Sequence, residues 1–183
     1  MSDDMDSRQR NIGEVPTATE IAGAVTEQHG MIRSAFHAAK NGSDTTKRDA
    51  TRYLLQLLAM HEAAEQLTVH PALLRAGGGV VGVGEDRMEE EEQATQLVER
   101  LQGFEYGTYE HNMQFALLEE AVTHHAEAEE RSELPLFDEL DETERLTIAQ
   151  ALGAVARAVE EDELVAYGPF STMVSAATSW LAR

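Results

Sequence analysis

The chain has 183 residues and no cysteine, and 34 acidic against 14 basic side chains give it a formal charge of −20. This length suits one domain with a substantial core, and the absence of thiols excludes disulfides, thiolate metal sites and cysteine nucleophiles. A surface this acidic repels phosphate and anionic lipid, so we expect no nucleic-acid partner and no membrane partner.

The N-terminal part of the chain predicts a disordered segment followed by helices. Residues 1–16 are polar and charged and lack the apolar core of a signal peptide, so we expect an acidic, disordered start and a cytoplasmic protein. A first helix is predicted from Thr17 to Lys40, because Thr17 and Glu20 can form a capping box. A second helix is predicted from Thr46 to Val69.

Further helices follow a glycine-rich run from Gly77 to Gly84. This run lacks the lysine of a phosphate-binding loop, so we interpret it as a flexible link. Helices are predicted over Glu85–Gln102, Tyr109–Leu134 and Asp141–Glu160. The uncharged stretch near the C-terminus approaches the length of a membrane span, but its large apolar residues recur at helical spacing. That pattern favours an amphipathic last helix that starts at Pro169.

The arrangement of these helices predicts an all-α fold. Long amphipathic helices with short connections favour an antiparallel up-down four-helix bundle, here over residues 17–140. Residues 141–183 are then a C-terminal helical extension that packs on the bundle.

Two of the predicted helices carry the same pair of polar residues, His61-x-x-x-Glu65 and His125-x-x-x-Glu129. Side chains at positions i and i+4 project from one helix face, so each pair can offer an imidazole and a carboxylate to one metal site. Chance alone gives about one such pair in a chain of this composition. The position of both pairs on apolar stripes carries more weight, because an ionised glutamate is costly to bury unless it is paired or binds metal.

The two pairs also lie in segments that look like copies of one helix ending. HEAAEQLTVHP and HAEAEERSELP each place a proline ten residues after the histidine. An internal repeat predicts that the preceding helix supplies an equivalent residue to each copy. For the first copy that residue is His29. For the second it falls in the run Glu89–Glu92, where helical phase with Val98 and Leu101 selects Glu91.

Other polar residues are ranked by helical phase. Glu62 lies about 100° round the helix from His61 and is a weaker candidate ligand. His70 lies about half a turn out of phase with His61, so it is expected at a helix end and is also a weaker candidate. The residues expected on the solvated face are Glu127, Glu130 and Glu133.

Three imidazoles and three carboxylates around one point suit a pair of iron ions, because di-iron carboxylate proteins are built this way in bundle cores. Zinc would use fewer ligands in a closed tetrahedral site, and manganese suits the same donors as iron. The predicted ligands are His29, His61, Glu65, Glu91, His125 and Glu129.

A family resemblance appears at these residues. The segments TEQHGMIR, HEAAEQLTVHP, MEEEEQATQLVERL and HHAEAEERSELPLF resemble the hemerythrin family, in particular its bacterial HHE cation-binding branch, over about residues 17–140. The resemblance implies an oxo- or hydroxo-bridged diiron centre, and by position it assigns as ligands His29, His61, Glu65, His125 and Glu129. Oxygen-carrying hemerythrins have histidines in the third helix, where this chain offers only Glu89–Glu92. The added negative charge favours ferric iron, so we expect reaction with an oxidant in preference to O2 transport.

Three functions compete at this stage. The first is a non-haem diiron protein that binds or reacts with O2, hydrogen peroxide or nitric oxide, with catalase- or peroxidase-type turnover as its enzymatic form. The second is an iron sensor or store without turnover, in which the C-terminal helices contact a protein partner. The third is a bundle without metal, which would have to bury six ionisable groups at high cost.

Overall fold

The computed structural model describes residues 15–41, 43–76 and 83–183. The predicted disordered segment 1–16 and the glycine-rich link Gly77–Gly84 lie largely outside these ranges. Every regular element in the described part of the chain is helical, with no strand, which confirms the all-α prediction.

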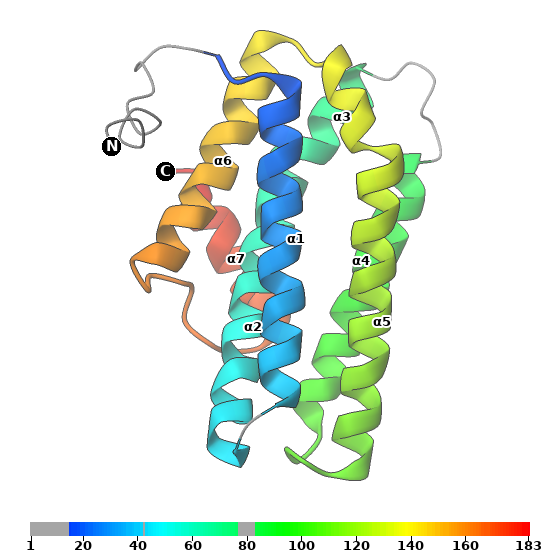
Figure 1. Ribbon diagram of the computed structural model, residues 1–183, viewed down its shortest axis with the longest axis vertical. Helices are drawn as coiled ribbons and strands as arrows, with labels where there is room; N and C mark the ends of the chain where they lie inside the picture. The colour runs from blue at the N-terminus through cyan, green and yellow to red at the C-terminus, as the bar shows by residue number, and fades with distance from the viewer. Residues whose placement is uncertain (1–14, 42, 77–82) are drawn as a thin grey trace, which may run out of the picture.

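Four long helices form the body of the molecule. They are α1 (Ala18–Lys40), α2 (Asp44–Ala64), α4 (Val83–Gly103) and α5 (Tyr109–Ser132). They lie side by side along the long axis of the molecule and alternate in direction (Figure 1). The predicted capping box of Thr17 and Glu20 starts α1, and the Ser43 and Thr108 side chains cap α2 and α5.

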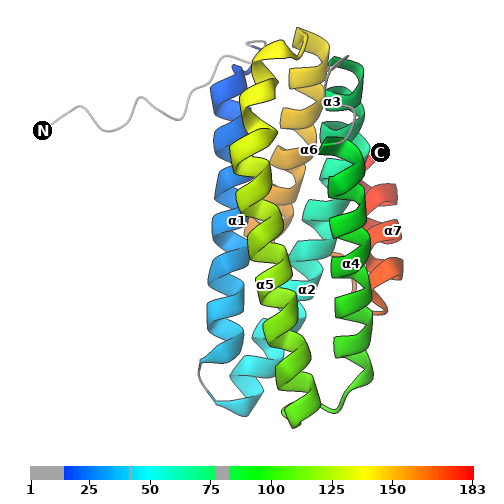
Figure 2. The same ribbon diagram turned by 90° about the vertical axis from the view of Figure 1, so that its right-hand side faces the viewer.

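Shorter elements complete the chain. They are a π-helical turn (Glu65–Val69), α3 (His70–Ala76), a 3₁₀ segment (Leu134–Glu139), α6 (Glu142–Glu160) and α7 (Phe170–Leu181). α6 lies against α1 and α2, and α7 lies against α2 and α4 (Figure 2). Among the described residues, we find no helix that combines the length and the apolar character needed to cross a lipid bilayer.

The second helix is the centre of the molecule. Its sequence predicts one buried stripe through Leu54, Leu58 and His61, yet every residue from Leu57 to Glu65 is buried. A helix is buried all round when other elements cover each of its faces, and α2 packs against α1, α6 and α7. The C-terminal helices therefore belong to the same hydrophobic core as the helices that carry the candidate ligands.

The last helix is held in place by glutamine side chains. Gln102 of α4 accepts a hydrogen bond from the Phe170 backbone N–H at 3.1 Å and donates one to the Gly168 carbonyl at 2.9 Å. Gln56 of α2 donates to the Val165 carbonyl at 2.6 Å. The bond to Phe170 satisfies an N–H group that the start of α7 would otherwise leave unpaired.

Two predicted helix ends differ from the structure. The chain stays helical through Pro71 as far as Ala76, because the π-helical turn lies directly before the proline. In a regular α-helix the proline ring would clash with the Leu67 carbonyl, and the wider π-helical turn relieves that clash. α5 ends at Ser132, and Pro135 lies in the 3₁₀ segment that follows.

Candidate metal centre

Buried histidine and glutamate side chains gather in the core of the bundle. They come from all four long helices and from the segment that follows α2. Each is less than one-tenth exposed: His29, His61, Glu62, Glu65, His70, Glu91, His125, Glu129 and Glu133. Side chains of this kind are rarely buried unless they are paired or bind metal, so the cluster marks a candidate site.

His70 reaches this cluster because of the π-helical turn. Nine residues of α-helix would set His70 about half a turn from His61. The turn Glu65–Val69 holds one extra residue, which brings His70 back to about 80° from His61. His70 Nε2 lies 3.1 Å from Glu91 Oε1 and 3.9 Å from Glu129 Oε1. The prediction that His70 lies out of phase at a helix end is therefore wrong.

One group of donors brings together α1, the end of α2 and α5. His29, His61, Glu65 and Glu129 each offer one nitrogen or oxygen, and these atoms all lie within 4.8 Å of one another. His29 Nε2 is 3.2 Å from Glu129 Oε2, and His61 Nε2 is 3.3 Å from Glu65 Oε1. The two imidazole rings meet edge to face, with their centroids 5.0 Å apart.

Two neighbouring groups share carboxylates with the first. One group consists of Glu65, Glu91 and His125, and the other consists of His70, Glu129 and Glu133. Glu65 and Glu129 therefore each belong to two groups. The structure brings the six predicted ligands together, while their binding of a metal ion stays a prediction.

The outward-facing nitrogens of three histidines have partners of their own. The Nδ1 of His29 lies 2.9 Å from Glu130 Oε1. The Nδ1 of His61 lies 3.2 Å from Gln28 Oε1, and that of His125 lies 3.1 Å from Glu90 Oε2. Metal-binding histidines usually bond a carboxylate, carbonyl or water through the second ring nitrogen, which fixes the ring and its tautomer. These contacts leave each Nε2 facing the cluster.

Two of the three glutamates expected on the solvated face belong to the site instead. Glu130 hydrogen bonds to His29, and Glu133 is only 2% exposed and lies in one of the groups above. The sequence does carry a signal for Glu133, since it follows Glu129 by four residues on the same helical stripe. Glu127 is exposed, as expected.

Many buried atoms of the cluster have no hydrogen-bond partner. Among the described residues these atoms include His29 Nε2, both oxygens of Glu65, His70 Nε2, Glu91 Oε1, His125 Nε2 and Glu129 Oε2. An unsatisfied buried polar atom costs about 1–3 kcal/mol, so native proteins keep few of them. Their convergence fits a cation, which nitrogen and carboxylate oxygen donors would bind together.

The charges of the metal-free cluster oppose one another. Burial lowers the pKa of His61 to about 3, and the neighbouring His29 adds to this effect. Burial also raises the pKa of Glu65 well above its ordinary value, and the charge of Glu129 raises it further. For Glu62 burial again has the largest effect and raises the pKa, followed by the charge of Glu91. A bound cation would relieve this mutual repulsion between carboxylates.

Two members of the cluster have neighbours that outweigh the effect of burial on their pKa. Burial alone would raise the pKa of Glu129, but the adjacent His29 and His70 outweigh it and hold this pKa below its usual range. Burial alone would lower the pKa of His70, but Glu129 and Glu91 raise it. Glu129 therefore acts as the negative centre around which the imidazoles gather.

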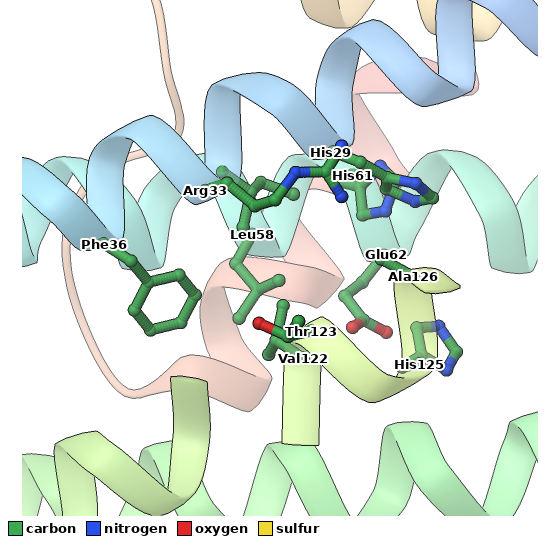
Figure 3. Close-up of a pocket in the computed structure, with 11 residues that line it drawn as sticks. His29, Arg33, Phe36, Leu58, His61, Glu62, Val122, Thr123, His125 and Ala126 are labelled. Carbon is green, nitrogen blue, oxygen red and sulfur yellow. The ribbon is translucent and has the colours of Figure 1, made fainter. Parts of the chain in front are cut away.

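A small cavity lies beside the cluster (Figure 3). Its volume is about 10 Å³, which is room for one molecule the size of water. Phe36, Leu58 and Val122 give it an apolar wall, and His61 and His125 are among its polar lining residues. Glu62, the weaker candidate, lines this cavity and does not belong to any of the three groups.

The comparisons with known proteins agree with the geometry. The family model of the hemerythrin HHE cation binding domain matches residues 21–137, which confirms the resemblance predicted from the sequence. No curated protein and no solved structure is found to match the chain. The matched segment contains all the buried histidines and glutamates described above.

Proposed function

This chain belongs to the hemerythrin family of HHE cation-binding domains, and we propose that its core binds two iron ions and reacts with a small oxidant. The oxidants that we consider are O2, hydrogen peroxide and nitric oxide. The observation that carries the proposal is the sharing of Glu65 and Glu129 between neighbouring donor groups. A carboxylate with two oxygens can bind two ions at once, so shared carboxylates suit a pair of metals.

The residues divide between two ion positions. His29 and His61 would hold the first ion, His70, Glu91 and His125 the second, and Glu65 and Glu129 would bind both. Iron bound there supplies the redox chemistry. More imidazoles and carboxylates converge here than the four ligands of a structural zinc site, which favours iron or manganese.

The surrounding side chains limit what can reach the ions. The apolar wall of Phe36, Leu58 and Val122 excludes bulk water, and a cavity of about 10 Å³ admits only a molecule of a few atoms. Glu62 contributes the carboxyl group of this cavity, and burial raises its pKa. In its protonated form, Glu62 can donate a hydrogen bond to a small molecule in the cavity.

The acidic third helix favours oxidant chemistry over reversible carriage of O2. Glu91 and Glu90 of α4 occupy the region where an oxygen carrier has imidazoles, and both are placed against histidines of the site. Additional negative charge stabilises the more positive ferric state. We therefore propose turnover of peroxide, of the catalase or peroxidase type, as the enzymatic form of this activity.

Metal content and kinetics test the proposal in order. Protein purified without a metal-binding tag and loaded with Fe²⁺ under argon should hold about two irons per chain and show near-ultraviolet bands after oxidation. Stopped-flow mixing of the ferrous form with peroxide should then give rapid oxidation. One zinc per chain, or no metal, would contradict the iron site. A long-lived, reversible adduct with O2 would contradict the proposed preference for reaction.

One contact favours a second candidate, an iron sensor or store. Gln28 joins His61 to α6, because its Nε2 donates to the Leu152 carbonyl at 3.1 Å while its Oε1 contacts the His61 ring. A change at His61 on metal binding would thus reach the C-terminal helices. Hydrogen exchange of α6 with and without iron tests this: equal protection of α6 in both states would contradict a sensor.

A further inference from the structure

A second pocket opens between α3 and α4, with a lining that shares no residue with the cavity beside Phe36. Its volume is about 470 Å³, and it is lined by Gln66, His70, Pro71, Leu74, Glu91, Glu92 and Thr95. Its lining is polar where it meets the cluster and its mouth is exposed, whereas the cavity in Figure 3 is small and mainly apolar. The site therefore has two approaches of different chemistry.

The floor of the α3–α4 pocket is part of the candidate metal site. His70 is 8% and Glu91 is 5% exposed, and His70 Nε2 and Glu91 Oε1 have no hydrogen-bond partner. The other carboxylate oxygen of Glu91 accepts a hydrogen bond from Gln66 Nε2 at 2.9 Å. Glu92 is exposed at the mouth. The pocket thus leads from an exposed carboxylate to a buried imidazole and a buried carboxylate whose facing atoms lie 3.1 Å apart.

Size decides which approach a metal ion can use. A divalent cation arrives with about six waters, and at about 30 Å³ per water this shell occupies roughly 180 Å³. The α3–α4 pocket has room for such an ion, whereas the cavity beside Phe36 has room for about one water. Of these two pockets among the described residues, the one between α3 and α4 has room for an ion that has not yet lost its waters.

We propose that the α3–α4 pocket is the route by which a hydrated divalent cation reaches the core, an inference that rests on the proposed metal-binding function. Glu92 attracts the ion at the mouth, and the Gln66 carboxamide oxygen and the Glu91 carboxylate replace its waters one by one. His70 then receives the ion at the floor. The oxidant uses the small cavity beside Phe36, which shares no lining residue with this pocket, so metal loading and oxidant access are separate.

Loading kinetics test the proposal on the full chain. The metal-free protein is mixed with Co²⁺ in a stopped-flow instrument, and the visible absorption of bound cobalt reports the rate of loading. Glu92→Gln removes the charge at the mouth, and Thr95→Phe places an aromatic ring in the pocket. Glu99→Gln is the matched control, because Glu99 is exposed on the same helix about 10 Å further along its axis.

The proposal expects slower loading to the same final occupancy. Glu92→Gln should load about threefold more slowly at low salt, with a difference that shrinks as salt screens the charge. Thr95→Phe should also load more slowly, because the aromatic ring narrows the path past Glu91 and His70. Loading of both variants at the wild-type rate, or equal slowing by Glu99→Gln, would overturn the proposed route. If Thr95→Phe does not fold, Glu92→Gln against Glu99→Gln decides.

The same experiment separates this proposal from the proposed function. Equilibrium dialysis measures how many ions each chain finally holds. Wild-type protein that binds no Co²⁺ and no Fe²⁺ at equilibrium would overturn the metal site itself, and the loading route with it. Normal occupancy with unchanged loading rates in the pocket variants would overturn the route alone.

Discussion

The segments His61–Pro71 and His125–Pro135 start alike and end differently. Each begins with a histidine and a glutamate four residues later and has a proline at its tenth following position. The first passes through a π-helical turn into α3 and delivers His70 to the site. The second stays α-helical to Ser132, delivers Glu133 and then changes to a 3₁₀ segment. The kind of helix that follows the His-x-x-x-Glu pair thus determines which later side chain of the segment reaches the site.

The surroundings of the two histidines differ as well. Glu62 follows His61, whereas Ala126 follows His125, and both line the same small cavity. The Nδ1 of His61 meets the neutral amide of Gln28, whereas that of His125 meets a carboxylate. A repeat that supplies equivalent ligand pairs therefore supplies two chemically different halves of one site, which the following experiments can separate.

The largest effect should come from the carboxylates that the halves share. Glu65→Ala or Glu129→Ala should each lower iron from about two per chain to less than one, because either residue belongs to two donor groups. Plasma emission on folded, iron-loaded protein measures this. Glu127→Ala, an exposed neighbour on α5, should keep both irons. Retention of two irons by Glu65→Ala would show that this carboxylate does not join the halves.

Single-residue deletions should separate the two helix endings. Deletion of Leu67 removes the extra residue of the π-helical turn and should convert it to α-helix with His70 still facing the site. Deletion of Arg131 in regular α-helix rotates everything after it by about 100°, which moves Glu133 away and disturbs the buried Phe137.

The two deletions should differ in their effect on the site. The Leu67 deletion should keep about two irons per chain, with a lowered Tm because Pro71 then lies in regular α-helix. The Arg131 deletion should lower Tm by about 10 °C, given a loss of about 3–5 kcal/mol for a core phenylalanine. Thermal unfolding and metal content measure both. Loss of iron on removing Leu67 would show that the π-helical turn does more than reset helical phase.

Helical periodicity explains how much of the site could be predicted. The stripe through His61 and Glu65 and its counterpart in α5 follow from i, i+4 spacing, and phase alone selects Glu91. His70 could not be placed, because a single extra residue in the π-helical turn changes the phase of everything after it. Gln28 carries no signal, since its role depends on α6 and on a ring from another helix.

Long-range packing likewise limits how much of the fold can be predicted from the sequence. Capping boxes and glycine signals predict several helix boundaries, because they act within a few residues, whereas the ends expected at Pro71 and Pro135 differ. The burial of α2 on every face depends on α6 and α7, which arrive about 80–120 residues later in the chain. Amphipathic pattern alone therefore underestimates the buried surface of the central helix.

A stability measurement should isolate Glu62, the residue that the second segment lacks. Because the pKa of Glu62 is raised in the folded state, the metal-free protein becomes less stable as pH rises above about 4.5, the pKa of this carboxyl in the unfolded chain. Glu62→Gln removes this loss, so the variant should be more stable than wild type at pH 7.

The pH dependence gives the control for this variant. Below about pH 4.5 the Glu62 carboxyl is protonated in both folded and unfolded chains, so the advantage of Glu62→Gln should disappear. The pKa of His61 is lowered to about 3 in the folded protein, so His61 reduces the stability of the fold as pH falls below about 6.5. This reduction is the same in wild type and in Glu62→Gln. Urea unfolding at pH 7 and pH 4.5 measures the difference. An advantage of equal size at both pH values would point to packing and not to charge.

The smallest effect should come from exchanging the groups behind the two imidazoles. Gln28→Glu gives His61 a carboxylate partner like that of His125, which makes the imidazole a stronger donor and should lower the reduction potential of bound iron. Glu90→Gln makes the opposite change at His125 and should raise it. Shifts of about 30–60 mV correspond to about 0.7–1.4 kcal/mol for a one-electron couple. Spectroelectrochemistry on iron-loaded protein measures them. Shifts of the same sign in both variants would show that overall charge, and not the partner of each ring, sets the potential.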